Sequence, residues 1–212
     1  MNGALTLARE LAHPQTLVVA LHFAAQLHQF QGEPLMAFER AQEVVALADE
    51  NGLELWLAFG NADLGWAEAE LGQAAKGIEQ IRRGLAAYEA TGAKLWRPYF
   101  LGLLAMALCK ADQVEEALAV ANEAVALAEL TGERYSTAEL FRIKGETSLR
   151  AGAANPADIG AMSQAAVHAQ ACFAEGLRIA RQQGAKAWEL RLLTRMECFN
   201  QQKSNPVDAG KC

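Results

Sequence analysis

Three charged residues have the type and spacing that acid–base chemistry would need. Glu139 and Glu146 lie seven residues apart, with Arg142 between them. Residues at these separations share one face of an α-helix, and paired carboxylates can exchange protons with a substrate. The same spacing also forms ordinary ion pairs along a helix, which is our preferred interpretation because nothing else in the sequence supports an enzyme. We therefore predict no catalytic activity.

The remaining reactive residues are scattered. His22 and His28 are six residues apart, so on one helix they point to different sides, and His168 stands alone. The cysteines have no zinc or redox spacing, which predicts reduced, packed thiols; they are Cys109, Cys172, Cys198 and Cys212. The motifs GxxxxGK[ST], GxGxxG, HExxH and GxSxG do not occur. We expect no metal site and no cofactor.

Composition indicates the class of element that carries these residues. Alanine and leucine make up 72 of the 212 residues, whereas valine, isoleucine and threonine together number 21, which predicts an all-α chain. The net charge of −6 argues against a nucleic-acid partner. Residues 11–32 contain no aspartate, glutamate, lysine or arginine but have seven histidines and glutamines, too many for a membrane span. The start has no basic signal-peptide region, so we expect a cytoplasmic protein.

The sequence repeats with a period of 40 residues. One series, Gly32, Gly72, Asp112 and Gly152, is offset by 20 residues from a second, Gly52, Gly92 and Gly132. The second series resumes at Gly184, which indicates an insertion of twelve residues that we place at 153–164. With this insertion, Trp56, Trp96 and Trp188 occupy one repeat position. Each half-repeat predicts a helix that ends at a left-handed glycine.

Two such helices form a hairpin that cannot bury its apolar face alone, so hairpins must stack. We predict one domain over residues 1–200, an α-α superhelix of about four 40-residue hairpins. Its repeats are 13–52, 53–92, 93–132 and 133–184, between a partial opening helix and a terminal helix at 185–200. The predicted helices are 14–31, 34–51, 54–71, 74–91, 94–111, 113–131, 134–151, 165–183 and 186–200, and residues 201–212 are predicted to be disordered.

Small residues recur at fixed offsets within the repeat. A mid-helix glycine costs up to about 1 kcal/mol relative to alanine, so we interpret these positions as close helix contacts and predict that they pack the repeats against one another. They are Gly65, Ala105 and Gly145 in first helices and Ala37, Gly77, Ala117 and Ala169 in second helices. With Leu64–Gly65, Gly72, Gly77 and Gly84, the pattern resembles the tetratricopeptide repeat (TPR), although its period of 40 exceeds that family's usual 34. The recurring tryptophans are predicted to pack between repeats.

Four segments are similar to a narrower group of proteins. They are RPYFLGLLA (97–105), GLAAYEATGA (84–93), AELFRIKGE (138–146) and ARQQGAKAWELR (180–191). They resemble the C-terminal repeats of large bacterial proteins that also contain a nucleotide-cyclase domain and a P-loop ATPase domain. The resemblance implies a sensor or scaffold arm, and no cyclase or ATPase activity carries over to these residues.

The TPR resemblance also implies a concave groove lined by first helices. Carrying over the family's groove positions gives His22, Gln26, Phe59, Trp66, Tyr99, Met106, Glu139, Arg142 and Glu146. The implied function is a protein-interaction module that binds a partner peptide, helix or domain. Packing between helices remains the alternative for Phe59 and Trp66, and a small-molecule effector-sensing arm remains the alternative function. Exposed terminal repeats make a homodimer a further expectation.

Overall fold

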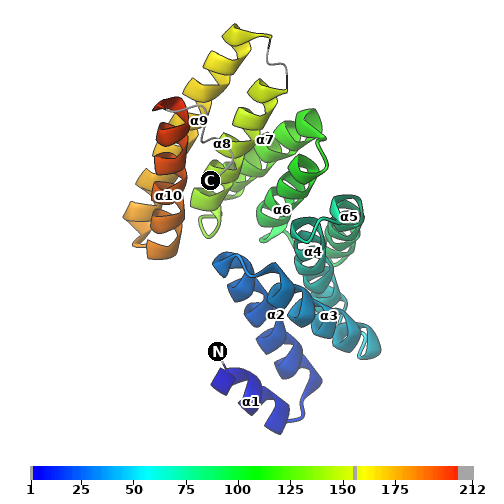
Figure 1. Cartoon of the computed structure of the whole chain (residues 1–212). Helices are drawn as coiled ribbons and strands as arrows, with labels where there is room; N and C mark the ends of the chain where they lie inside the picture. Colours follow the sequence, from blue (N-terminus) through cyan, green and yellow to red (C-terminus); the bar gives the residue numbers. More distant parts are fainter. Residues whose placement is uncertain (1, 155–156, 205–212) are drawn as a thin grey trace. The chain divides into compact units, whose positions relative to one another are not determined.

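The computed structural model describes residues 2–154 and 157–204. Within these ranges the chain forms ten α-helices and no strand (Figure 1). The helices are α1 (Asn2–Glu10), α2 (Pro14–Gln31), α3 (Pro34–Glu50), α4 (Glu54–Glu70), α5 (Ala74–Ala90), α6 (Arg97–Lys110), α7 (Val114–Thr131), α8 (Thr137–Ala153), α9 (Ile159–Gln183) and α10 (Lys186–Ser204). The predicted all-α fold of paired helices is confirmed.

Three helices begin three or more residues away from their predicted starts. Helices α6 and α8 each start three residues later than predicted, at Arg97 and Thr137. Helix α9 starts six residues earlier, because the Asp158 side chain caps it by accepting a hydrogen bond from the Ala161 N–H at 2.8 Å. Helix α10 continues to Ser204, so the tail predicted to be disordered begins with helix, and its residues 205–212 lie outside the described part.

The glycine series mark the turns. Gly32, Gly52, Gly72, Gly92, Gly132 and Gly184 all have positive φ, between 63° and 87°, a conformation that glycine adopts without steric cost. Asp112 takes the same position in its series with φ 57°. Gly152 differs, since α8 continues through it to Ala153. A Cβ at Gly152 would lie 2.5 Å from the Ala165 Cβ of α9, so this glycine permits close helix packing.

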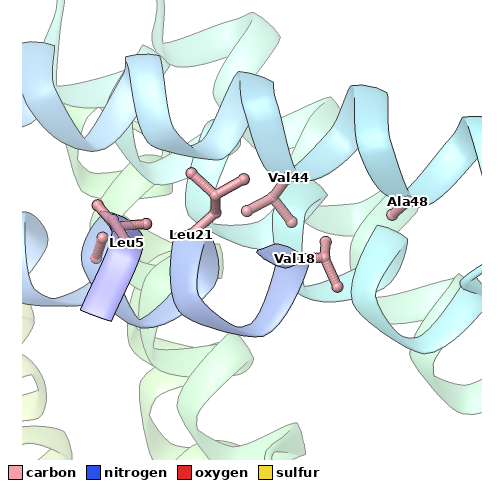
Figure 2. Packing of buried hydrophobic residues seen from close by; sticks show 6 residues of the cluster. Leu5, Val18, Leu21, Val44 and Ala48 are labelled. Atoms are coloured by element: carbon pink, nitrogen blue, oxygen red, sulfur yellow. The ribbon is translucent and has the colours of Figure 1, made fainter. Parts of the chain in front are cut away.

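The chain divides into two compact units between Ala117 and Leu118. In the first unit, α1, α2 and α3 bury a cluster of aliphatic side chains (Figure 2). The cluster consists of Leu5, Val18, Leu21, Ala24, Val44 and Ala48. Helix α2 also contacts α4, and α4 contacts α5 and α6. Helices α2 and α4 therefore each pack against their own second helix and the first helix of the next repeat.

Missing side chains allow the closest contact in this unit. A Cβ at Gly65 of α4 would lie 2.5 Å from the carbonyl oxygen of Gly77 in α5, and a Cβ at Gly77 would lie still closer to the carbonyl oxygen of Gly65. Real Cβ atoms do not approach a carbonyl so closely, so only glycines fit this crossing. This contact joins the two helices of one repeat, and a role of the small residues in packing between repeats stays a prediction.

The second unit contains α8, α9 and α10, which contact one another. Glycines also permit close helix contacts in this unit. A Cβ at Gly145 of α8 would lie 2.5 Å from the Phe173 ring of α9. A Cβ at Gly176 of α9 would lie 2.9 Å from the carbonyl oxygen of Ala138 in α8. No helix in the described ranges is long and apolar enough to cross a bilayer.

Candidate functional site

The groove residues predicted in the first unit lie inside it. Five are buried and Met106 is half-buried; the buried five are His22, Gln26, Phe59, Trp66 and Tyr99. Of these, Trp66 is only 4% exposed. In this conformation a ligand could touch little of these side chains, so their role in binding stays a prediction.

An aromatic cluster explains much of this burial. The Phe59 ring lies 4.7 to 5.7 Å, centroid to centroid, from five other rings. They belong to His22, Trp56, Tyr88, Trp96 and Phe100. Such tilted and edge-to-face pairs stabilise a core beyond the area they bury. The cluster joins α2, α4, α5 and α6, and it includes two of the three tryptophans predicted to pack between repeats.

Polar atoms in this interior are held by specific partners. The His22 Nδ1 lies 2.7 Å from the Asp63 Oδ2, and both side chains are buried. The Tyr99 hydroxyl donates to the Gln29 Oε1 at 2.6 Å. The first contact joins α2 to α4, and the second joins α2 to α6. Both therefore fix how the first helices of different repeats pack. The Trp66 Nε1 is buried and has no hydrogen-bond acceptor among the described residues.

The charged residues predicted in the second unit do come together. The Arg142 guanidinium donates to both carboxylate oxygens of Glu139, at 2.8 and 2.6 Å. Its Nη1 lies 2.6 Å from the Glu146 Oε1. Glu139 and Arg142 are buried, whereas Glu146 is half-buried. The ion-pair interpretation agrees with this geometry, although the pair with Glu139 is shielded from solvent.

Two arginines of α10 complete this cluster. The Arg191 Nη2 lies 3.2 Å from the Glu139 Oε1, and the Arg195 Nε lies 3.0 Å from the Glu146 Oε1. Their side chains are 29% and 24% exposed, so they are the cluster's cations that solvent can reach. The Arg191 guanidinium also lies 5.5 Å from the centroid of the Trp188 ring, a cation–π contact.

We call these five residues the charged face: Glu139, Arg142, Glu146, Arg191 and Arg195. Sequence reasoning missed the two on α10. They are four residues apart and share one side of a helix, but only the folded chain shows that this side meets α8. Three arginines against two glutamates leave one net positive charge on the face.

Burial and pairing act in opposite directions on the central pair. Burial alone would raise the pKa of Glu139, but the charges of Arg142 and Arg191 and the Arg142 hydrogen bonds outweigh it and lower that pKa. For Arg142, burial lowers the pKa, and the neighbouring Glu139 and Glu146 more than offset this and raise it. The central pair is therefore ionised at neutral pH, which excludes Glu139 as a general acid there.

A second polar cluster also lacks an activated nucleophile. The His168 Nδ1 lies 2.9 Å from the Ser148 Oγ, and its Nε2 lies 4.0 Å from the Cys172 Sγ. The Ser148 hydroxyl also donates to the Lys144 carbonyl oxygen at 2.8 Å. Burial raises the pKa of the Cys172 thiol, and Lys144 only partly opposes this, so the thiolate is disfavoured.

The candidate metal ligands are dispersed as well. His22 contacts Asp63, while the His28 Nδ1 lies 2.6 Å from the Glu33 Oε2. Among the described residues, no group of three histidine, cysteine or acidic side chains is arranged to hold a metal ion. Three of the cysteines, Cys109, Cys172 and Cys198, are free thiols.

Solved structures with the same helix arrangement establish the type of fold. The apo form of RapI aligns over 96% of this chain and 75% of its own, with a TM-score of 0.59 and 15% identity. The TPR-like repeats of a putative kinesin light chain from Podosopora anserina align over 91% of this chain and 98% of theirs, with a TM-score of 0.55 and 20% identity. The fold is TPR-like.

A third structure with this TPR-like fold is Bacillus thuringiensis PlcR in complex with the peptide PapR7 and DNA. It aligns over 87% of this chain and 67% of its own, with a TM-score of 0.58 and 19% identity. No family model matches the sequence. An uncharacterized protein of Rhizobium meliloti (strain 1021) is 33% identical over 140 residues, which are 62% of this chain and 14% of that protein. The TPR-like chain thus spans about a seventh of this relative.

Proposed function

We propose that this chain is a non-catalytic interaction module that binds a protein or peptide partner. TPR-like folds generally serve this purpose, and the PlcR structure holds a peptide. The observation that carries the proposal is the charged face, where two arginines remain partly exposed beside a buried ion pair. A partner carboxylate can contact these arginines without breaking the buried pair.

Arg191 and Arg195 are the residues that we assign to the partner. Each has one glutamate neighbour and an exposed fraction of its side chain, and charge-assisted hydrogen bonds from arginine to a carboxylate are among the strongest in proteins. Arg142 is unsuitable because Glu139 and Glu146 occupy its donors. The preferred partner is therefore a peptide segment with at least one acidic side chain or a free C-terminal carboxylate.

The wider role that we propose is a scaffold arm in a bacterial signalling protein. It is supported by the resemblance of four segments to repeats that accompany cyclase and ATPase domains. The long relative, of which this chain covers 14%, is consistent with a repeat region within a larger polypeptide.

Selection from a random peptide library, followed by calorimetry, tests the proposal. We expect a selected acidic peptide to bind the wild type, and Arg191→Ala and Arg195→Ala each to weaken binding about tenfold, the equivalent of about 1.4 kcal/mol. The matched control is Arg178→Ala, which removes an exposed arginine of α9 that pairs with Glu175. Equal affinity in all four proteins would contradict the assignment.

Variants of the buried residues would be poorer tests. Trp66 and Arg142 are only 4% and 6% exposed, so their alanine variants would lose binding by losing structure. If no peptide is selected but a small metabolite raises Tm, the effector-sensing alternative gains support; a ligand at 100 times its Kd adds about 2.7 kcal/mol.

A further inference from the structure

Two side chains of α9 that can bind metal ions lie close together. His168 and Cys172 are four residues apart, so they share one side of the helix. The His168 Nε2 lies 4.0 Å from the Cys172 Sγ, a separation that is too long for a strong hydrogen bond. An imidazole nitrogen and a thiol sulfur therefore face each other across a gap.

Ser148 of α8 determines which nitrogen of His168 carries the proton. The Ser148 hydroxyl donates its one hydrogen to the Lys144 carbonyl oxygen at 2.8 Å. The same hydroxyl oxygen lies 2.9 Å from the His168 Nδ1, where it acts as an acceptor, so the Nδ1 is the protonated nitrogen. In the neutral ring the lone pair is then on the Nε2, which faces Cys172. Histidine ligands of metal ions are typically oriented in this way, by an acceptor at the other ring nitrogen.

The burial of the pair suits a bound cation. Cys172 is 5% exposed and Ser148 is 3% exposed, whereas His168 is exposed, so an ion can enter from the side of the imidazole. Burial raises the pKa of the Cys172 thiol, and the charge of Lys144 only partly opposes this. A cation that replaces the thiol proton offsets the cost of burying a thiolate.

The number and charge of the ligands select a soft monovalent ion. Zinc sites take three or four protein ligands, but the described helices contain no group of three histidine, cysteine or acidic side chains suited to a metal ion. One thiolate and one neutral imidazole bind a monovalent cation as a neutral unit. A divalent ion would instead leave a positive charge in a partly buried site, near the charge of Lys144.

The ion of this class that suits both ligands is Cu(I). Thiolates select Cu(I) among the first-row metals, imidazole also binds copper, and Cu(I) forms stable complexes with only two ligands. Bonds as long as those of zinc, about 2.0 Å to nitrogen and about 2.3 Å to sulfur, would span at most about 4.3 Å. The gap of 4.0 Å between the Nε2 and the Sγ lies within this limit.

We propose that His168 and Cys172 bind one Cu(I) ion, with Ser148 as a positioning residue. The Cys172 thiol releases its proton to solvent as the sulfur–copper bond forms, and the copper keeps its oxidation state. The site shares no residue with the charged face and does not depend on a partner. The zinc and redox spacings that the sequence lacks do not describe a pair of ligands, so their absence does not exclude this site.

Anaerobic titration of the reduced chain with Cu(I), in competition with the chromophoric chelator bicinchoninate, tests the proposal. We expect the wild type to retain one Cu(I) ion, and Cys172→Ser and His168→Ala each to lower the affinity for that ion at least about tenfold. The control is Cys109→Ser, which removes a half-buried free thiol of α6 and should leave the affinity unchanged. Because His168 is exposed, the thermal melt of its alanine variant should match that of the wild type.

Nitrogen NMR of the histidine rings tests the role of Ser148 separately. In the copper-free chain at mildly alkaline pH, we expect His168 to be protonated at the Nδ1 and unprotonated at the Nε2. Addition of Cu(I) should shift the Nε2 resonance more than the Nδ1 resonance. Ser148→Ala should populate the other tautomer and weaken Cu(I) binding about tenfold.

Two results would overturn the proposal. One is equal affinity for Cu(I) in the wild type and His168→Ala, because the imidazole would then not be a ligand and any bound copper would be held by separate thiols. The other is a copper-free wild type in which the His168 Nε2 carries the proton, since that nitrogen would then have no lone pair for the ion.

Discussion

At the scale of single residues, the turns between helices depend on residues with positive φ. Ala12 has φ 50° and lies forty residues before Gly52. The regular spacing of glycines along the chain predicts most of these turns, but it does not show that Ala12 adopts the same conformation. A side chain in this region costs about 1–2 kcal/mol, so Ala12 is strained where glycine would not be.

Replacing Ala12 with glycine should therefore stabilise the protein. We expect Ala12→Gly to raise the free energy of unfolding by about 0.5–1 kcal/mol, because relief of the strain exceeds the added entropy of the unfolded chain. Urea denaturation measures the change. Gly52→Ala, at the equivalent turn, should lower the free energy of unfolding by about 1 kcal/mol; a gain there would refute the shared conformation.

The glycine crossing of α4 and α5 gives a larger effect. A Cβ at Gly77 would meet the Gly65 carbonyl and lie 2.9 Å from the Ala69 nitrogen. We expect Gly77→Ala to lower the free energy of unfolding by about 3 kcal/mol, since two backbones must separate. The control is Gly3→Ala, where nothing lies within 4 Å of the added Cβ. There the higher helix propensity of alanine should leave stability unchanged or improved.

Glu133 should make stability depend on pH. Burial raises the pKa of Glu133 to about 7 from an ordinary value of 4.5, despite the opposing effect of Ser136. A raised pKa stabilises the fold below pH 4.5, and this contribution is lost as pH rises through about 7. Glu139 affects stability with the opposite dependence on pH. Because its pKa is lowered, its contribution to the free energy of unfolding is present above the ordinary pKa of 4.5 and is lost as the pH falls below that value.

Urea denaturation of Glu133→Gln at several pH values isolates this effect. Relative to the wild type, the variant should gain on the order of 2 kcal/mol between pH 4.5 and 7 and no more above that range. The exposed Glu50 serves as control, and Glu50→Gln should track the wild type. A pH-independent difference between Glu133→Gln and the wild type would show that the buried carboxyl does not titrate in this range.

At the scale of helices, the sequence predicted which segments are helical more reliably than where they begin. Periodic glycines and prolines marked α2 to α5 to within one residue at each end. The sequence predicts the start of α9 six residues too late, because Pro, Asn and Gly in 153–164 indicate a loop. The Asp158 cap extends the helix through part of that segment.

This cap can be tested directly. Asp158→Ala should destabilise the first turns of α9 by about 1 kcal/mol, because the Ala161 N–H loses its acceptor. Hydrogen exchange should accelerate in residues 159–164 and stay unchanged near Gly176. Asp49→Ala, an exposed substitution on α3, is the control. Unchanged exchange at the start of α9 would show that the cap does not hold this segment.

At the scale of the whole molecule, the repeat predicted the fold, but the binding surface needed coordinates. Small residues at fixed offsets indicated stacked hairpins, and the TPR-like fold confirms this class. The groove positions carried over from the family include buried packing residues such as Phe59. Arg191 and Arg195 were missed because their glutamate partners lie on α8, far away in the sequence.

The central claim is that a partner binds at the charged face. Hydrogen exchange of the chain with and without a selected acidic peptide tests it most directly. We predict slower exchange in α8 around Glu139 and Glu146, and in α10 around Arg191 and Arg195, when the peptide is bound. Protection confined to α2, α4 and α6, with α8 and α10 unchanged, would contradict the account.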